Sequence, residues 1–179
     1  MSVIPAKLVP AQAGSGNTEP QNRRVTLMIE LTAQPLDPEK FTTAVRGSTN
    51  GAVVTFLGTT RDNFEGKRVL TLEYEAFDEM AVKKLEEVRQ ELMAEFGLDD
   101  VAIGHRTGTV AIGEISLVVS VGSPHRKEGF HACHKAVDRI KEVVPIWKKE
   151  VYEDGSRWVA CEDHEFTHEH EAALEVGDG

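Results

Sequence analysis

Cysteine is scarce in this sequence, aromatic residues make up only 6% of it, and no long hydrophobic run is present. The two cysteines, Cys133 and Cys161, are not spaced as a Cys-x-x-Cys pair, which argues against a disulfide framework and against a cysteine zinc site. No apolar run approaches the roughly 20 residues that cross a bilayer, and the first residues do not resemble a signal peptide. We therefore expect a cytoplasmic protein without a membrane partner.

An excess of acidic residues gives the chain a net charge of -10, but this excess is concentrated at one end. Residues 160–179 hold seven of the 30 acidic residues and no Lys or Arg, which leaves 23 acids against 20 bases in the rest. We predict that 160–179 forms an acidic flexible tail and that 1–24, rich in Pro, Gly, Gln and Asn, forms a disordered leader. One folded domain is expected over 25–159. Because basic residues are not in excess, we expect no nucleic-acid partner.

Strand and helix patterns are interleaved irregularly within 25–159, which predicts an α+β fold with a mixed, largely antiparallel sheet and about three helices. Helices are expected after the capping pair Asp37 and Pro38, from about 78 to a stop at Gly97, and from about 124 to a stop at Pro145. Strands are expected at 25–33, 51–58, 69–77, 100–108, 115–121, 146–153 and 156–160, with a polar loop at 59–68.

Three apolar features of these elements are expected to lie in the core. The β-branched content of 51–58 is typical of a buried strand. Phe130 shares a helical period with Cys133 and Ile140, which places it on the core side of the third helix. Trp147 is expected to anchor the segment that follows Pro145.

A candidate anion site lies at the start of the third predicted helix. The turn there places His125 and Arg126 among free backbone amides and the positive end of the helix dipole, and a guanidinium suits a phosphate. An ordinary helix start with two exposed polar residues is an equally good interpretation. Arg61, where a strand meets the polar loop, is placed to reach a ligand over the sheet edge, although a lone loop arginine is more often solvated.

Two lysines form a second candidate cluster: Lys141, in the last turns of the third helix, and Lys148, three residues after Pro145. If the segment after Pro145 folds back along the helix, the two ammonium groups approach each other. Like charges in a partly desolvated pocket favour a neutral amine, which serves as an acid, a base or a nucleophile. The alternative is that Lys141 pairs with Asp138 and that Lys148 is solvated.

Three histidines in the predicted tail, His164, His168 and His170, are separated by four and two residues. Because no core pattern surrounds them, adventitious metal affinity is a better interpretation than a structural or catalytic site, and we expect no metal site. The sequence contains no Ser-His-Asp order and no glycine-rich phosphate loop.

The order of these elements resembles the large, catalytic subunit of molybdopterin synthase from about residue 25 to residue 159. The resemblance rests on "GAVVTFLGTTRDNFEGK", "LEYEAF" followed by "MA", "HRTG", "HR" at the third helix, "DRIK", and "VPIWKKE" with "RWV" behind it. Each motif is weak alone, but together and in this order they are highly specific. The resemblance implies an α/β-hammerhead fold.

The same resemblance implies partners and an activity. It implies a homodimer of this chain that binds a small ubiquitin-like sulfur carrier at each end, which gives a heterotetramer. The carrier's C-terminal Gly-Gly thiocarboxylate would donate sulfur twice to cyclic pyranopterin monophosphate, making the dithiolene of molybdopterin without a further cofactor. An alternative function on the same fold is a regulatory module that binds a pterin or nucleotide phosphate.

Site residues follow from the resemblance position by position. The family's substrate-binding arginine and the residues before it match Thr59, Thr60 and Arg61, and its His-Arg pair matches His125 and Arg126. Its two functional lysines and the stretch beside the second match Lys141, Lys148, Lys149 and Glu150.

The roles that the resemblance implies divide between substrate and carrier. Arg61, His125 and Arg126 would hold the substrate's phosphate and pterin. Lys141 would serve in acid/base or covalent work, and Lys148 would position or polarise the carrier's terminal carbonyl.

Overall fold

Two sheets, three helices and one short hairpin are built from residues 28–159, the part of the chain that the computed structural model describes. The first sheet has the strand order β1-β6-β8-β2, in which only β1 and β6 are parallel. Its strands are β1 (Ile29–Thr32), β2 (Ala52–Thr59), β6 (Asp100–Arg106) and β8 (Ile115–Ser123).

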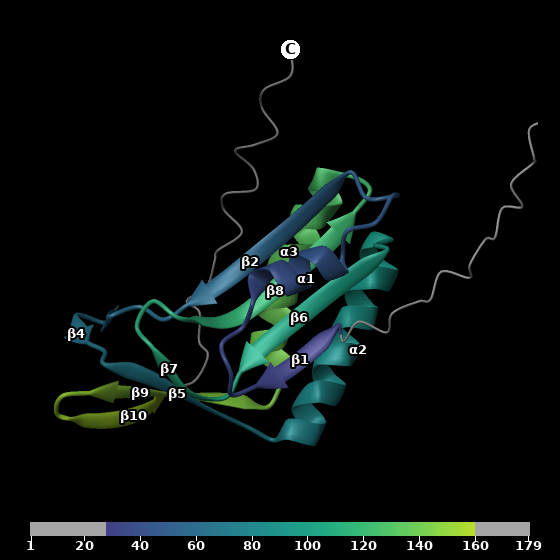
Figure 1. Ribbon diagram of the computed structural model, residues 1–179. Coiled ribbons are helices and arrows are strands. Elements are labelled where there is room, and N and C mark those ends of the chain that lie inside the picture. The colour runs from purple at the N-terminus through teal and green to yellow at the C-terminus, as the bar shows by residue number, and fades with distance from the viewer. Residues whose placement is uncertain (1–27, 160–179) are drawn as a thin grey trace, which may run out of the picture.

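The second sheet is antiparallel throughout and has the order β10-β9-β5-β7. Its strands are β5 (Thr71–Ala76), β7 (Gly108–Ala111), β9 (Ile146–Tyr152) and β10 (Gly155–Val159). It projects from the first sheet together with a small hairpin of β3 (Asn63–Phe64) and β4 (Lys67–Arg68), so the molecule has a body and a smaller arm (Figure 1). The predicted α+β fold with a mixed, largely antiparallel arrangement is confirmed.

The three helices are α1 (Pro38–Ala44), α2 (Asp78–Phe96) and α3 (Arg126–Val143). The Asp37 carboxylate accepts a hydrogen bond of 3.0 Å from the Glu39 amide and so caps α1. Gly97 ends α2 in the left-handed region at φ 62°, and Pro145 follows the end of α3. The three predicted helices are therefore confirmed, as are the predicted ends of α2 at Gly97 and of α3 before Pro145.

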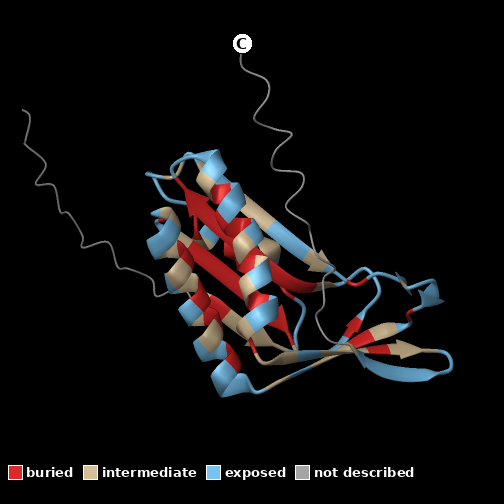
Figure 2. Ribbon diagram, turned by 180° about the vertical axis from the view of Figure 1, so that it is seen from behind, coloured by how far each residue is buried: buried red, intermediate tan, exposed pale blue. Residues whose placement is uncertain are grey.

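Helices cover both faces of the first sheet, whereas the second sheet packs against the same hydrophobic core at one end, through Ala76 and Ile146. Helices α2 and α3 pack against each other and over one face (Figure 2), where Leu85, Val119 and Ala136 belong to the larger core cluster. Helix α1 covers the other face with Phe41 and Val45. Because both faces of β8 are covered, eight of its nine residues are buried.

The chain passes from one sheet to the other within a segment predicted as a single strand, 100–108. Strand β6 ends at Arg106 in the first sheet, and β7 begins at Gly108 in the second. Gly108 has a φ of 72°, a conformation that glycine adopts without steric cost. The predicted loop 59–68 likewise contains structure, since it holds the β3–β4 hairpin.

Three predictions about the core were wrong. Strand β2 lies at the edge of its sheet and exposes Val53, Phe56 and Leu57. Phe130 is 61% exposed, because it lies on the side of α3 that turns away from the core. Trp147 is 54% exposed on the face of the second sheet that no helix covers.

The predictions of a leader at 1–24 and an acidic tail at 160–179 fall outside the described residues, as do His164, His168 and His170. Within 28–159, no helix combines the length and the apolar character needed to span a membrane.

Contact between α1 and β6 generates a prediction for stability. A Cβ atom at Gly104 would lie 2.3 Å from Cζ of the buried Phe41 ring. We expect Gly104→Ala to lower the free energy of unfolding by about 1–3 kcal/mol, as overpacking of a dense core does. Urea unfolding measures this loss. Phe41→Leu is the matched control, because shortening the ring relieves the clash, so the double variant should lose less than the two single losses together. Additive losses would contradict the prediction.

Candidate active site

A cavity of about 240 Å³ lies at the seam between the body and the arm, beside the C-terminal half of α3. One wall comes from β2, β6 and β8 of the first sheet, and the opposite wall comes from β5 and β9 of the second. The short strand β3 contributes Asn63 and Phe64, and α3 contributes Ile140. Segments from most of the described chain therefore meet at this cavity.

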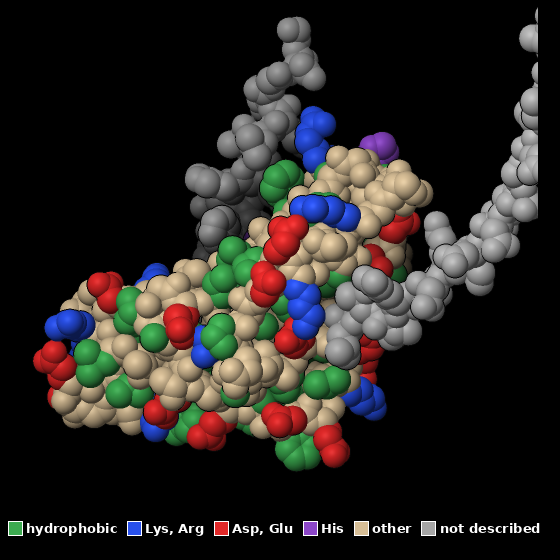
Figure 3. Space-filling view, in the orientation of Figure 1, with side chains coloured by type: hydrophobic (Ala, Val, Ile, Leu, Met, Phe, Trp, Pro, Cys, Tyr) green, Lys and Arg blue, Asp and Glu red, His purple; other side chains and the backbone are tan. Residues whose placement is uncertain are grey.

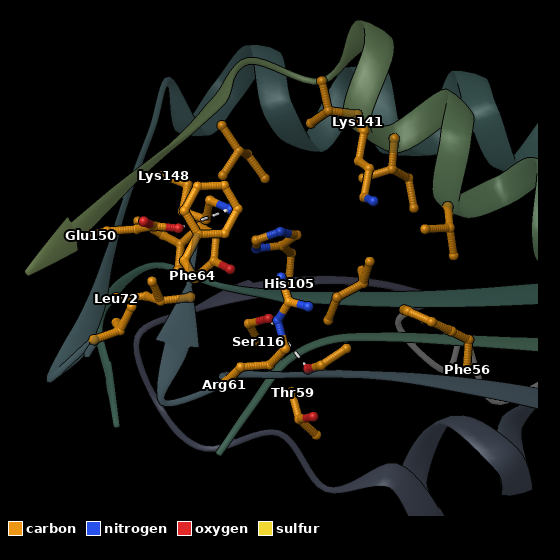
Figure 4. A pocket seen from close by; sticks show the side chains of 18 of the residues that line it. Phe56, Thr59, Arg61, Phe64, Leu72, His105, Ser116, Lys141, Lys148 and Glu150 are labelled. Atoms are coloured by element: carbon orange, nitrogen blue, oxygen red, sulfur yellow. Dashed lines mark hydrogen bonds and ion pairs between the residues drawn. The ribbon is translucent and has the colours of Figure 1, made fainter. Parts of the chain in front are cut away.

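Three cations and one carboxylate line the cavity: Arg61, Lys141, Lys148 and Glu150. Lys141 reaches in from α3 and Lys148 from β9, while Arg61 approaches from the opposite wall (Figure 4). With Thr59, which also lines the cavity, five of the predicted site residues share one space. The excess of positive side chains suits a ligand that carries phosphate or carboxylate groups.

Lys148 and Glu150 form a connected pair on the cavity side of β9. Glu150 is only 2% exposed, and its Oε1 lies 3.5 Å from Lys148 Nζ. The Tyr152 hydroxyl donates to Glu150 Oε2, and this hydrogen bond raises the pKa of Tyr152 to about 12. Lys148 Nζ also lies 5.5 Å from the centre of the Phe64 ring. These contacts hold the Lys148 ammonium at the cavity wall.

An irregularity at the end of β2 positions Arg61. The register between β2 and β8 shifts between Gly58 and Thr59, and the Ser116 hydroxyl donates to the Gly58 carbonyl at 3.2 Å. Thr60 is then fixed by two backbone hydrogen bonds, from its amide to Glu114 and from Gly113 to its carbonyl. A bulge of this kind redirects the chain, here so that Arg61 leaves the sheet edge beside the cavity.

His125 and Arg126 do not line the cavity of their own chain. His125 occupies the N-cap position of α3, where its side chain forms no capping hydrogen bond, and Arg126 is the first residue of the helix, whereas Lys141 lies near its C-terminus. At 1.5 Å per residue, Arg126 and Lys141 are about 22 Å apart along the helix axis. Both residues at the N-terminus are exposed. Within a single chain, the His-Arg pair therefore lies far from the cavity that contains Arg61 and Lys141, although the sequence predicted that both bind one substrate.

Thr60 and Lys149 also lie outside the cavity lining. Thr60 is 3% exposed and belongs to the turn described above. Lys149 lies on the opposite face of β9 from Lys148, where its Nζ contacts Glu73 at 2.9 Å and the Trp158 ring at 5.8 Å. Strand alternation explains this separation, since adjacent residues point to opposite faces of a sheet.

Comparison with known proteins identifies the family of this chain. Residues 31–143 match the family model described as MoaE protein. The chain belongs to the MoaE family. It is 43% identical over 131 residues to the molybdopterin synthase catalytic subunit of Bacillus subtilis, covering 73% of this chain and 83% of that protein.

Solved structures give the same family and fold. The structure of molybdopterin synthase from Staphylococcus aureus is 39% identical, covers 76% of this chain and 98% of that chain, and has a TM-score of 0.72. The complex of subunits 1 and 2 of the molybdopterin-converting factor from Helicobacter pylori is 18% identical, with a TM-score of 0.62 over 76% of this chain and 93% of that chain, and this likeness is one of fold.

The cavity of this MoaE-family chain contains residues for which the sequence predicted no role, above all His105, which entered only as part of the motif "HRTG". Its ring lies in the middle of the cavity (Figure 4). The rings of His105 and Tyr74 pack edge to face, with centroids 5.1 Å apart and planes at 76°. A histidine in the otherwise apolar run of β6 was the available signal, because a buried polar residue in a strand needs a specific partner.

Thiol and metal chemistry have little support among the described residues of this MoaE-family chain. Burial raises the pKa of the Cys133 thiol to about 11, so this side chain carries no thiolate near neutral pH, and it does not line the cavity. Within 28–159, no group of three or more His, Cys, Asp or Glu side chains is arranged to hold a metal ion.

Burial of His105 generates a prediction for pH dependence. Desolvation lowers the pKa of its imidazole from the ordinary 6.5 of histidine to about 4. The His105 imidazole therefore takes up a proton near pH 6.5 in the unfolded chain but stays unprotonated at that pH in the folded chain. We expect His105 to contribute stability that is complete above pH 6.5 and is lost as pH falls towards 4, by about 3 kcal/mol in total.

Urea unfolding between pH 4 and pH 7.5 measures this loss, with His105→Gln as the control. The variant keeps every titrating carboxylate but lacks the imidazole, so its stability should fall less steeply than that of the wild type over this range. Parallel curves for the two chains would contradict the prediction.

Proposed function

We propose that this chain is the catalytic subunit of molybdopterin synthase. In this proposal it transfers sulfur from the thiocarboxylated C-terminus of a small carrier to cyclic pyranopterin monophosphate, forming the dithiolene of molybdopterin. The observation that carries the proposal is the convergence of Arg61, Lys141 and Lys148 on one cavity in a MoaE-family chain. The reaction uses no resident cofactor, since the carrier supplies the sulfur.

The cavity's side chains suit the two reactants. In each transfer the thiocarboxylate sulfur forms a bond to a substrate carbon while a carbon–oxygen bond at that carbon breaks, and the displaced oxygen leaves with a proton. Water then cleaves the bond between that sulfur and the carrier's acyl carbon. The carrier leaves as a carboxylate. Arg61 binds the substrate's phosphate, Lys148 beside Glu150 polarises the carrier's terminal carbonyl, and Lys141 transfers protons at the reacting centre.

Reconstitution tests this function. We expect product only when the chain, a thiocarboxylated carrier and cyclic pyranopterin monophosphate are all present, with the dithiolene detected after oxidation to a fluorescent pterin. Lys141→Ala should lower turnover by at least about 100-fold, because loss of a general acid or base removes a factor of this size. Lys83→Ala is the matched control, since Lys83 is an exposed lysine of α2 outside the cavity. Full activity of Lys141→Ala would overturn its role, and carrier binding without any product would indicate a binding module.

We further propose that two copies of this chain associate and that each binds one small carrier, giving a heterotetramer in the cytoplasm. Support for self-association comes from the edge of the body. Strand β2 exposes Val53, Phe56 and Leu57, Phe130 of the adjacent α3 is exposed as well, and hydrophobic side chains are visible along β2 in Figure 3. An unpaired strand edge with apolar side chains is a surface that a second copy covers well.

The distance between the two ends of α3 makes the second copy part of the site. Arg126 is about 22 Å along the helix from Lys141, and His125 precedes it, so one chain does not bring them to its own cavity. We propose that these two residues serve the cavity of the partner copy. This arrangement retains the substrate-binding role that the family resemblance implies for them.

Mixing two inactive variants tests the shared site. Arg126→Ala and Lys141→Ala chains, unfolded and refolded together, should regain about a quarter of wild-type activity, because half of the two-fold dimers are mixed and each contains one intact site. The control is a mixture of Lys141→Ala with Lys148→Ala. Both lysines line the same cavity, so every site of that mixture lacks one of them and activity should stay absent. Equal recovery in both mixtures, or in neither, would contradict the shared site.

A further inference from the structure

His105 is a buried titratable side chain of the cavity, and the roles proposed above leave it unused. It lies near the end of β6, opposite Leu117 of β8, and is 7% exposed. Its ring shares the cavity with Arg61, Lys141 and Lys148. A polar group placed so centrally in a binding cavity affects whatever binds there.

One hydrogen bond fixes the tautomer of this ring. His105 Nδ1 lies 2.8 Å from the carbonyl oxygen of Arg106. A carbonyl oxygen only accepts, so Nδ1 carries the hydrogen and the neutral ring has its lone pair on Nε2. Within 28–159, no other group forms a hydrogen bond with His105. Its ring packs edge to face with the ring of Tyr74. Nε2 is therefore a hydrogen-bond acceptor available to a ligand.

The rest of the cavity gives this acceptor a particular value. Arg61, Lys141 and Lys148 only donate hydrogen bonds, and the Glu150 carboxylate already contacts Lys148 and Tyr152. Oxygen acceptors also line the cavity, on Ser116 and Asn63, which are bonded to Gly58 and Gly66, and on the hydroxyls of Thr59 and Tyr74, but among these lining side chains His105 offers the nitrogen acceptor. Cations recognise the phosphate of a ligand, but a ring N–H of the same ligand needs an acceptor.

We propose that His105 is a positioning residue whose Nε2 accepts a hydrogen bond from a ring N–H of the bound pterin. This inference rests on the proposed function and deepens it, because it assigns the group that orients the heterocycle while Arg61 and the lysines bind the anionic parts. Nitrogen heterocycles with N–H groups are the ligand class that this acceptor selects.

A proton-transfer role fits His105 less well. Burial keeps its imidazole neutral down to about pH 4, so the ring is a weak base at neutral pH. General bases work best with a pKa near the working pH. A neutral acceptor, in contrast, keeps the same hydrogen-bonding pattern throughout the physiological range.

Two substitutions separate the acceptor from the structural contact. The amide nitrogen of His105→Asn reaches the position of Nδ1 and can still donate to Arg106, but the side chain is too short to replace Nε2. The longer His105→Gln places an amide oxygen near Nε2. Neither variant has the ring that packs on Tyr74, so the difference between them reports the acceptor. Thermal unfolding checks that both variants fold.

The test measures binding of cyclic pyranopterin monophosphate by calorimetry and turnover by reconstitution. We expect His105→Asn to raise Kd and KM by about 10-fold or more, because the ligand's N–H is left without a partner, and to change kcat by less than about 3-fold. His105→Gln should bind to within about 3-fold of the wild type. In a chain labelled with ¹⁵N-histidine, the Nε2 resonance that is missing in His105→Gln should shift upfield when substrate is added.

Each other outcome overturns the inference. Equal affinity of His105→Asn and the wild type, equal loss in both variants, or an Nε2 resonance that substrate leaves unmoved would show that no such hydrogen bond forms. If the wild type turns over normally while one of these results appears, only the role of His105 is overturned. If the wild type forms no product at all, the proposed function falls, and the inference falls with it.

Discussion

Pairing between β5 and β9 sets Tyr74 opposite Lys148 and Leu72 opposite Glu150, and the geometry of the cavity depends on this register. All four side chains lie on the inner face of the arm, turned towards the body. A slip of one residue would replace Lys148 and Glu150 with Trp147 and Lys149 on that face. The break at Pro145 makes this pairing possible, because it lets the chain leave α3 and return along β5.

The cavity lining has more cationic than anionic side chains, and the placement of Glu150 and His105 determines its electrostatics. The buried carboxylate of Glu150 lies between Lys148 and the Tyr152 hydroxyl, which stabilises one cation at the wall. His105 stays neutral because burial disfavours its charged form. The cavity therefore combines donors for an anion with a neutral nitrogen acceptor, a combination that suits a ligand with both a phosphate and a polar ring.

Much of the fold was predictable from local patterns. The capping pair at Asp37, the left-handed stop at Gly97 and the break at Pro145 act on their immediate neighbours, so the sequence alone locates these helix ends. Periodicity also located most strands. It did not say which faces another element would cover. Trp147 and Phe130 are apolar residues in regular elements, yet both are exposed, because nothing within 28–159 packs over their side.

For the site, the sequence by itself determined which chemical groups are available: the arginine at a strand end, the lysine pair around Pro145 and the His-Arg pair at a helix start. Only the tertiary structure decided which of them meet. Arg61, Lys141 and Lys148 line one cavity, with His105 at its centre. Lys149 lies on the opposite face of β9, and His125 and Arg126 lie at the other end of α3. The physical reason is that residue type and local spacing fix chemistry and secondary structure, whereas convergence depends on strand register and on packing between segments distant in sequence.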